Sequence, residues 1–207
     1  CTLNSPEEVY LSELLIDLNP FSGGVKYARS GAEAMSIAIR LARAYTKSDK
    51  VAFSGYHGWS DWYLATNIKG KNNLKNHLLP GLDPLGVPQA LLNTTFPFEY
   101  NNSKEFLKVI ETNPDIKIIC IEGARFDYPK KDFLNTIMQV AKKFNMIIVS
   151  DEITSGWRVT DGGVYKINGF KPDIVVYGKG MGGGYAISAV VGKKEIMQMA
   201  NESFVSS

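Results

Sequence analysis

The feature that most constrains the fold is a series of short apolar runs separated by amphipathic helical patterns. Residues 116–121, 146–150 and 174–177 are nearly continuous apolar runs rich in Ile and Val, and residues 131–144 place Phe133 and Ile137 on one helical face. Strands that are apolar on both faces and alternate with helices indicate βαβ crossovers and a mostly parallel sheet covered on both sides. We therefore predict an α/β fold, a three-layer sandwich around a mostly parallel sheet.

The rest of the chain extends this pattern with three helices and four shorter extended segments. The helices are predicted from residue 6 to about 19 after Ser5, over 31–45 after Ser30, and over 103–111 with Ser103 as the cap. The extended segments are 25–28, 50–54, 94–98 and 186–191. Between 66 and about 93, Gly, Pro and Asn interrupt every run, which predicts a lid or binding loop.

Composition is that of an ordinary globular protein and excludes several classes of function. The 207 residues are 44% hydrophobic and 21% charged, with a net charge of +2, so a single domain without nucleic-acid binding is expected. No apolar run approaches the roughly 20 residues of a membrane helix, and no zinc-ligand spacing is present. Cys120 lies in an apolar run far from Cys1, so we expect a buried thiol and a cytoplasmic location.

Polar residues recur where the predicted strands end. Such positions are Ser30 with Gly31, Tyr56 with His57, Glu122, Asp151 and Lys179. Each has an ordinary explanation when taken alone: a capping box, a packed turn, a strand end or a surface lysine. Parallel sheets bind ligands at the carboxyl ends of their strands, however, so five such positions at one edge indicate a cofactor site.

Pyridoxal phosphate is the cofactor whose chemistry uses these parts. Its phosphate suits a helix N-terminus such as that after Ser30, and its ring nitrogen stays protonated beside a carboxylate such as Asp151. Its aldehyde bonds to a lysine amine, and Lys179 stands among glycines that allow close approach to a ligand. Desolvation would lower the pKa of that amine and activate it.

Four ordered motifs resemble those of the class III aminotransferases. They are Ser30-Gly31-Ala32-Glu33-Ala34, Tyr56-His57-Gly58, Ser150-Asp151-Glu152-Ile153-Thr154-Ser155-Gly156-Trp157-Arg158, and the run 172–185 that contains Lys179. Within that family the chain is most similar to the glutamate-1-semialdehyde 2,1-aminomutase group, through residues 29–46 and Ile196-Met197.

The resemblance implies the large domain of the pyridoxal-phosphate-dependent transferases and a role for each motif. Lys179 would form the internal aldimine, Asp151 would pair with the ring nitrogen, and Tyr56 and Ile153 would sandwich the ring. Ser30, Gly31 and Ala32 would hold the phosphate. The remaining candidates are His57 for cofactor binding, and Glu122 and Trp59 as further site residues. Residues 60–93 resemble the gating region of the aminomutases.

The chain departs from the family pattern at identifiable positions. Ala32 stands where the family has Thr, which removes one hydroxyl contact to phosphate, and Gly123 follows Glu122 where the family has Pro. Trp59 and Trp62 are absent from the aminomutase pattern. By the same resemblance, an N-terminal segment and a small C-terminal domain are missing. We expect a homodimer whose partner subunit supplies a phosphate-binding Thr, and weak cofactor binding by residues 1–207 alone.

The predicted function is amino-group transfer between a small-molecule amino donor and a carbonyl acceptor. Intramolecular amino exchange by an aminomutase is the first alternative, and a fragment that keeps the fold with little activity is the second. A phosphate- or nucleotide-binding module built on 178–184 is a third, but a dinucleotide fingerprint would open a helix directly, whereas here a strand-like run follows. An interaction domain is disfavoured because Asp151 and Lys179 are intact.

Overall fold

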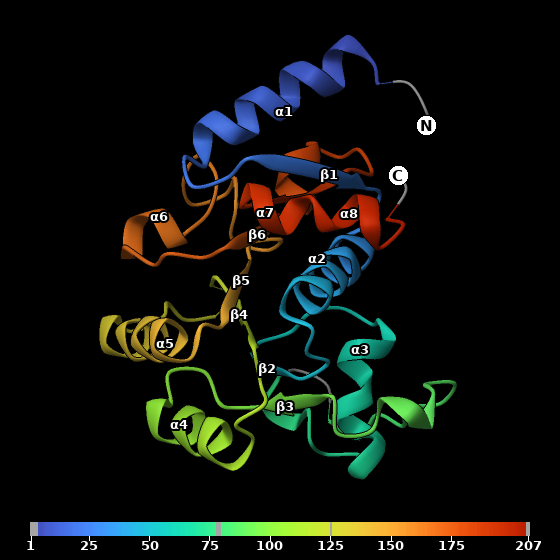
Figure 1. The fold of residues 1–207 in the computed structure, drawn as a ribbon, viewed down its shortest axis with the longest axis vertical. Coiled ribbons are helices and arrows are strands. Elements are labelled where there is room, and N and C mark those ends of the chain that lie inside the picture. Colours follow the sequence, from blue (N-terminus) through green and yellow to red (C-terminus); the bar gives the residue numbers. More distant parts are fainter. Residues whose placement is uncertain (1–3, 78–79, 125, 206–207) are drawn as a thin grey trace.

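The computed structural model describes residues 4–77, 80–124 and 126–205, which form a seven-stranded sheet (Figure 1). Its strands lie in the order β1 (Gly24–Ala28), β7 (Ser188–Gly192), β6 (Ile174–Tyr177), β5 (Ile147–Asp151), β4 (Ile118–Glu122), β2 (Val51–Ser54) and β3 (Thr95–Pro97). Strand β7 is antiparallel to both neighbours, and every other pairing is parallel. The predicted mostly parallel sheet is therefore confirmed.

Helices cover both faces of the sheet. One face carries α2 (Gly31–Thr46), α3 (Asp61–Leu64), α7 (Lys194–Met197) and α8 (Met199–Glu202), and the other carries α1 (Pro6–Leu18), α4 (Ser103–Thr112), α5 (Lys131–Phe144) and α6 (Tyr165–Asn168) (Figure 1). Successive strand residues enter opposite cores: Ile118 and Cys120 pack on the α2 side, whereas Ile119 and Ile121 pack on the α5 side. This alternation explains why the strands are apolar throughout, and it confirms the three-layer sandwich.

Helix starts follow the expected caps at two positions and differ at a third. Ser5 and Ser30 each cap their helix in a complete capping box. The α4 helix, however, is capped by Asn102, whose Oδ1 accepts from the Glu105 amide at 3.0 Å. Predicting Ser103 as the cap was therefore wrong by one residue, because Asn102 is an equally good cap and lies first along the chain.

The segment from 66 to 93 has more local structure than its broken periodicity indicated. After α3 come short 3₁₀ turns, η1 (Ala65–Lys69), η2 (Lys75–His77) and η3 (Gln89–Leu91). Asn67 accepts from the Leu74 amide and donates to the Leu82 carbonyl, so an asparagine interpreted as a breaker instead ties the segment together. Side-chain bonds to the backbone are what asparagine offers in turns, and period-based prediction does not detect them.

Three expectations about special residues have structural outcomes. Cys120 is a buried free thiol, as predicted, while Cys1 lies outside the described residues. Among the helices of the described residues, none has the length and apolar character needed to cross a membrane. Within the same ranges, no group of three or more His, Cys, Asp or Glu is placed to hold a metal ion.

The sheet brings the ends of five strands to one edge. Strands β2, β4, β5 and β6 are mutually parallel, and β1 runs in the same direction because the antiparallel β7 separates it from β6. Glu122 and Asp151, the last residues of β4 and β5, are direct neighbours in the register. Residues that follow these strands are therefore gathered at the edge where a parallel sheet binds ligands.

Candidate functional site

A cavity of about 230 Å³ lies at this carboxyl edge, between the start of α2 and the loops that follow β2, β5 and β6. Its walls are formed by Ser30, Gly31, Ala32, Tyr56, His57, Gly58, Trp59, Asp151, Ile153, Thr154 and Lys179. At roughly 30 Å³ per water molecule, it is large enough for a substituted six-membered ring. All the predicted site residues except Glu122 are brought together here.

The α2 end of the cavity presents backbone donors. Ser30 Oγ accepts from the Glu33 amide, and Glu33 Oε2 accepts from the Ser30 amide at 2.9 Å. This capping box uses the amide of Glu33. The amides of Gly31 and Ala32 belong to the first turn of α2, which lines the cavity, and first-turn amides are suited to bind an anion. A Cβ on Gly31 would lie 2.9 Å from Ile153 Cδ1, so glycine keeps this corner of the cavity open.

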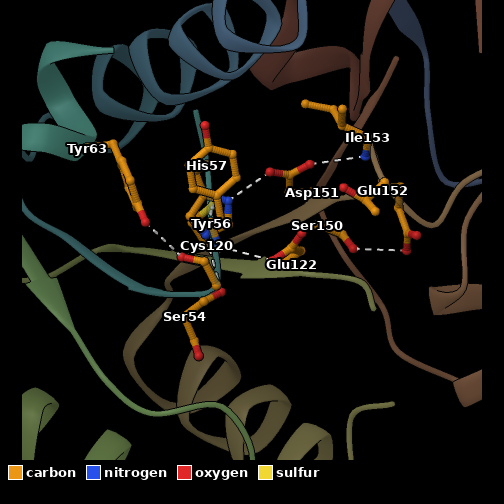
Figure 2. Close-up of polar contacts among 12 residues, drawn as sticks. Ser54, Tyr56, His57, Tyr63, Cys120, Glu122, Ser150, Asp151, Glu152 and Ile153 are labelled. Carbon is orange, nitrogen blue, oxygen red and sulfur yellow. Dashed lines mark hydrogen bonds and ion pairs between the residues drawn. The ribbon is translucent and has the colours of Figure 1, made fainter. Parts of the chain in front are cut away.

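Asp151 lies in the cavity wall and is held through both carboxylate oxygens (Figure 2). Oδ2 is 2.8 Å from His57 Nδ1, and Oδ1 accepts from the Ile153 amide at 3.0 Å. Both side chains are buried. Burial opposes a charge on His57, but its contacts with Cys120 and Asp151 outweigh this effect and hold the His57 pKa well above its usual range. His57 lines the cavity, yet both its ring nitrogens contact protein acceptors.

Lys179 opens a short 3₁₀ turn, η4 (Lys179–Gly182), directly after β6. Its φ of 46° is in the left-handed region, which is uncommon for a residue with a side chain. Its Nζ donates to Thr154 Oγ1 at 2.9 Å, so the ammonium is held toward the loop that follows Asp151. Lys179 is exposed in this chain.

An aromatic ring and an aliphatic side chain form further walls of the cavity. Tyr56 follows β2 and packs edge-on against Tyr63, with ring centroids 5.9 Å apart, while Ile153 is buried next to Gly31 and Gly178. Trp59 also lines the cavity and is 70% exposed, so it stands at the entrance rather than in the core.

Glu122 lies outside this cavity and lines a larger neighbouring hollow of about 810 Å³. Its Oε2 accepts from the Tyr56 amide at 3.0 Å (Figure 2). A Cβ on Gly55 would lie 2.5 Å from Glu122 Cβ, so the two segments are in close contact. Tyr56, whose amide donates to Glu122, lines both spaces.

Comparison with known proteins identifies the family. The model of "Aminotransferase class-III" matches residues 2–204. The chain belongs to the class III aminotransferases. Members of this family use pyridoxal phosphate, and the chain is also similar to a solved "transaminase with PLP bound", with 27% identity and a TM-score of 0.82 over 94% of this chain and 46% of that one.

Two curated relatives with different class III activities are similar to this chain. The 3-aminobutyryl-CoA aminotransferase of Cloacimonas acidaminovorans (strain Evry) is 36% identical over 205 residues, covering 95% of this chain and 45% of the relative. The glutamate-1-semialdehyde 2,1-aminomutase of Legionella pneumophila (strain Corby) is 34% identical over 197 residues, covering 92% and 45%. The chain therefore spans about half the length of the curated relatives it matches.

The residues of this class III chain fit a phosphorylated pyridine. The cavity joins the first turn of α2 to a buried carboxylate and a lysine amine, with an apolar and an aromatic wall. Any side chain at position 31 would fill the corner of the cavity next to Ile153. At Gly58 a Cβ would lie 3.2 Å from Ala32 Cβ, so glycine also keeps this wall of the cavity open. Donors, carboxylate and amine are the groups that this cofactor requires of a class III enzyme.

Two contacts of the predicted site residues did not follow from the sequence motifs of this class III chain. Thr154 holds Lys179, and its hydroxyl three residues after Asp151 was a usable signal, since both belong to one strand-end loop. Cys120 Sγ lies 3.8 Å from His57 Nδ1 and 3.7 Å from Nε2, and burial raises the pKa of its thiol. Nothing in the sequence around Cys120 links it to His57, because the contact depends on the β2–β4 register.

Proposed function

We propose that this protein is a pyridoxal-phosphate-dependent aminotransferase and that residues 1–207 form its large, cofactor-binding domain. The observation that carries the proposal is the single cavity that joins Lys179, Asp151 and the N-terminal turn of α2. Gly31 and Asp151 lie 148 and 28 positions before Lys179 in the sequence, yet all three residues line one cavity.

Each part of the cavity has a proposed role toward the cofactor. The amides of Gly31 and Ala32, with Ser30, hold the phosphate, because a helix N-terminus favours an anion. Tyr56 and Ile153 hold the two faces of the ring, and Asp151 pairs with its nitrogen. Pyridoxal phosphate supplies an aldehyde that bonds to amines and a protonated ring that withdraws electrons from the substrate α-carbon.

Lys179 has two proposed tasks. Its amine would hold the cofactor through the aldehyde, and Nζ would serve as general base and then as general acid for the proton of the substrate carbon. Thr154 Oγ1, 2.9 Å from Nζ, holds the amine at the cavity wall between these steps. The loop after β5 therefore positions both Asp151 and the base.

The substrates are proposed to be a small-molecule amino donor and a carbonyl acceptor. Aminotransferase and aminomutase relatives match at 36% and 34% identity, so intramolecular amino exchange is the competing activity. The full-length protein assayed with a panel of amino donors and keto or aldehyde acceptors distinguishes them. Transfer between two molecules supports the aminotransferase, and isomerisation of one amino aldehyde without an acceptor supports the aminomutase.

We further propose a homodimer in the cytoplasm. The free thiol of Cys120 suits a reducing compartment. The exposed Trp59 at the cavity entrance is a candidate contact for a second copy. Sedimentation of the purified full-length protein tests the assembly, and a purely monomeric species would contradict it.

The decisive experiment uses the absorbance of bound cofactor. The chain is incubated with pyridoxal phosphate, freed of excess and scanned in the visible region for the band of a lysine-bound cofactor. The band is expected in the wild type and in Lys171→Ala, a matched control at an exposed lysine before β6, and it should vanish in Lys179→Ala. A band that persists unchanged in Lys179→Ala would remove the assignment.

A further inference from the structure

The turn that follows β2 is held by side chains from more distant parts of the chain. The Gly55 amide donates to His77 Nδ1 at 3.1 Å, and Tyr63 Oη lies 3.3 Å from the carbonyl oxygens of both Gly55 and His77. The next residue, Tyr56, donates its amide to Glu122 Oε2 at 3.0 Å (Figure 2). His77 and Tyr63 therefore bind both backbone polar groups of Gly55, directly before a residue of the cavity wall.

Gly55 depends on such contacts to keep one conformation. Its φ of 108° lies in a region that glycine adopts readily and that other residues rarely adopt. Because glycine has a wide choice of other conformations, hydrogen bonds to its backbone are needed to select this one. A Cβ at this position would lie 2.5 Å from Glu122 Cβ, so a larger residue could not fix the turn by packing instead.

His77 is suited to accept the Gly55 amide. It is only 6% exposed, and its ring packs against Phe53 with the ring centroids 5.3 Å apart. An imidazole nitrogen that accepts a hydrogen bond carries no proton, so the ring is neutral with its proton on Nε2. Burial and the neighbouring His57 lower the pKa of His77 to about 4, which keeps this acceptor available at neutral pH.

The Tyr56 ring stands on the backbone that His77 holds. Tyr63 packs edge-on against this ring, at an interplanar angle of 87°. Tyr56 lines the cofactor cavity, whereas His77 lines the neighbouring hollow, which Tyr56 also borders. The η2 turn, which ends at His77, is thus joined to the cofactor cavity through the Gly55 backbone.

We propose that His77 is a positioning residue of the cofactor site: by accepting the Gly55 amide, it fixes the turn that sets the Tyr56 ring in the cavity wall. His77 acts through Gly55 and not by contact with the cofactor, because it lies in the wall of the neighbouring hollow. The use of the Tyr56 ring against the cofactor rests on the proposed function. The Gly55–His77 hydrogen bond is a property of the cofactor-free chain.

The hydrogen bond is tested first in the cofactor-free wild type by nitrogen-15 NMR at pH 7. An N–H···N bond transmits a scalar coupling between its two nitrogens. We expect such a coupling between the Gly55 amide nitrogen and Nδ1 of a neutral imidazole that carries its proton on Nε2. Absence of this coupling, or a proton on His77 Nδ1, would overturn the proposal, and this result needs no variant that fails or succeeds in folding.

Three variants separate the acceptor from the bulk of the ring. His77→Asn offers Oδ1 close to the place of Nδ1, and His77→Leu has bulk without an acceptor. Asn76→Ala is the matched control, because it changes the adjacent residue of η2, whose side chain donates to Glu99 at 2.6 Å. We expect faster exchange of the Gly55 amide and shifted Tyr56 ring signals in His77→Leu, and near wild-type values in the other two. Equal changes in His77→Leu and Asn76→Ala would overturn the positioning role.

Cofactor loading then shows whether the turn matters for the site. His77→Leu is expected to bind pyridoxal phosphate about tenfold more weakly than His77→Asn, as the loss of one hydrogen bond predicts, and to give weaker visible circular dichroism. Equal Kd values and equal dichroism of the two variants would overturn the role. A wild type without any cofactor band would contradict the proposed function, and the Gly55 coupling and the Tyr56 signals would then decide the role of His77.

Discussion

At the scale of single residues, Ala32 is the position where the proposed phosphate site lacks the side-chain hydroxyl that the family pattern has. Ala32 lines the cavity from the first turn of α2, and its side chain offers no hydroxyl. Gly58, which has no side chain, lies beside Ala32 Cβ. The α2 turn therefore depends on backbone donors where a side-chain donor could be added.

We predict that Ala32→Thr tightens pyridoxal phosphate binding. A hydrogen bond to a charged group contributes about 1.5–3 kcal/mol, which corresponds to about a tenfold or larger fall in Kd. Fluorescence titration of cofactor-free protein measures the change. Ala32→Val is the matched control, because it adds similar bulk without the hydroxyl, and equal affinities of the two variants would contradict the prediction.

His57 makes stability depend on pH. Its folded-state pKa is raised, because its contacts with Cys120 and Asp151 outweigh burial, so its stabilising contribution is complete below about pH 6.5. Above that pH the unfolded chain loses a proton that the folded chain keeps. The free energy of unfolding should then fall by about 1.4 kcal/mol per pH unit until the folded-state pKa is reached.

Urea denaturation at a series of pH values from 6.5 to 8.5 measures this slope. It should disappear from the His57→Asn variant and persist in His77→Asn. The pKa of His77 is lowered to about 4, so that residue is neutral in both states throughout this window. A wild type and a His57→Asn variant with parallel curves would refute the prediction.

At the scale of elements, the start of α4 depends on one side chain. Asn102 Oδ1 accepts from the Glu105 amide, and Glu105 in turn accepts from the Glu99 amide at 2.9 Å. We predict that Asn102→Ala lowers the free energy of unfolding by about 0.5–2 kcal/mol, whereas Asn102→Asp keeps the cap. Urea denaturation of both variants checks this, and an Asn102→Asp variant as unstable as Asn102→Ala would contradict it.

The loop after β5 is organised by the buried carboxylate of Glu152. Burial raises the pKa of Glu152, while four hydrogen bonds oppose that rise. Its oxygens accept from Ser150 Oγ at 3.2 Å, from Ser155 Oγ at 2.5 Å, and from the amides of Val164 and Tyr165 at 3.0 Å each. This connects both ends of the loop that carries Thr154 and Ile153 into the cavity.

We predict that Glu152→Gln destabilises the protein, because one of the two acceptor oxygens becomes an NH₂ group facing donors. Leaving a buried donor unsatisfied costs about 1–3 kcal/mol. Ser155→Ala, which removes one donor and leaves the carboxylate, should cost less. Thermal or urea denaturation compares them, and equal stability of Glu152→Gln and the wild type would contradict the assigned role.

At the scale of the whole molecule, the centre of the sheet is the most enclosed part of the backbone. Strands β4 and β5 are paired on both edges and buried on both faces, whereas nearly all of residues 80–93 are exposed. We predict that hydrogen exchange followed by mass spectrometry finds the slowest amides in β4 and β5 and the fastest internal ones in 80–93. Equal rates in the two regions would contradict this picture.

The amino-acid sequence by itself determined the layers and the local elements. Apolar runs of four to six residues that alternate with amphipathic helices are typical of strands covered on both faces, and the 3.6-residue repeat over residues 31–45 defines α2, so these followed from local pattern. Asp151 and Lys179 were found because each follows such a run, and Ser30 because it follows a predicted extended segment and caps the predicted helix.

Only the tertiary structure decided how these ends combine. The register of β2, β4 and β5 places His57 between Asp151 and Cys120, residues 94 and 63 positions away from it, and separates Glu122 from the cavity. The tertiary structure also brings Thr154 into contact with Lys179, and it gives Asn67, which the sequence pattern treats as a breaker, a hydrogen bond to the Leu82 carbonyl. Hydrogen bonds between distant side chains depend on the order in which strands pair, and this order is not contained in the periodicity of any one segment.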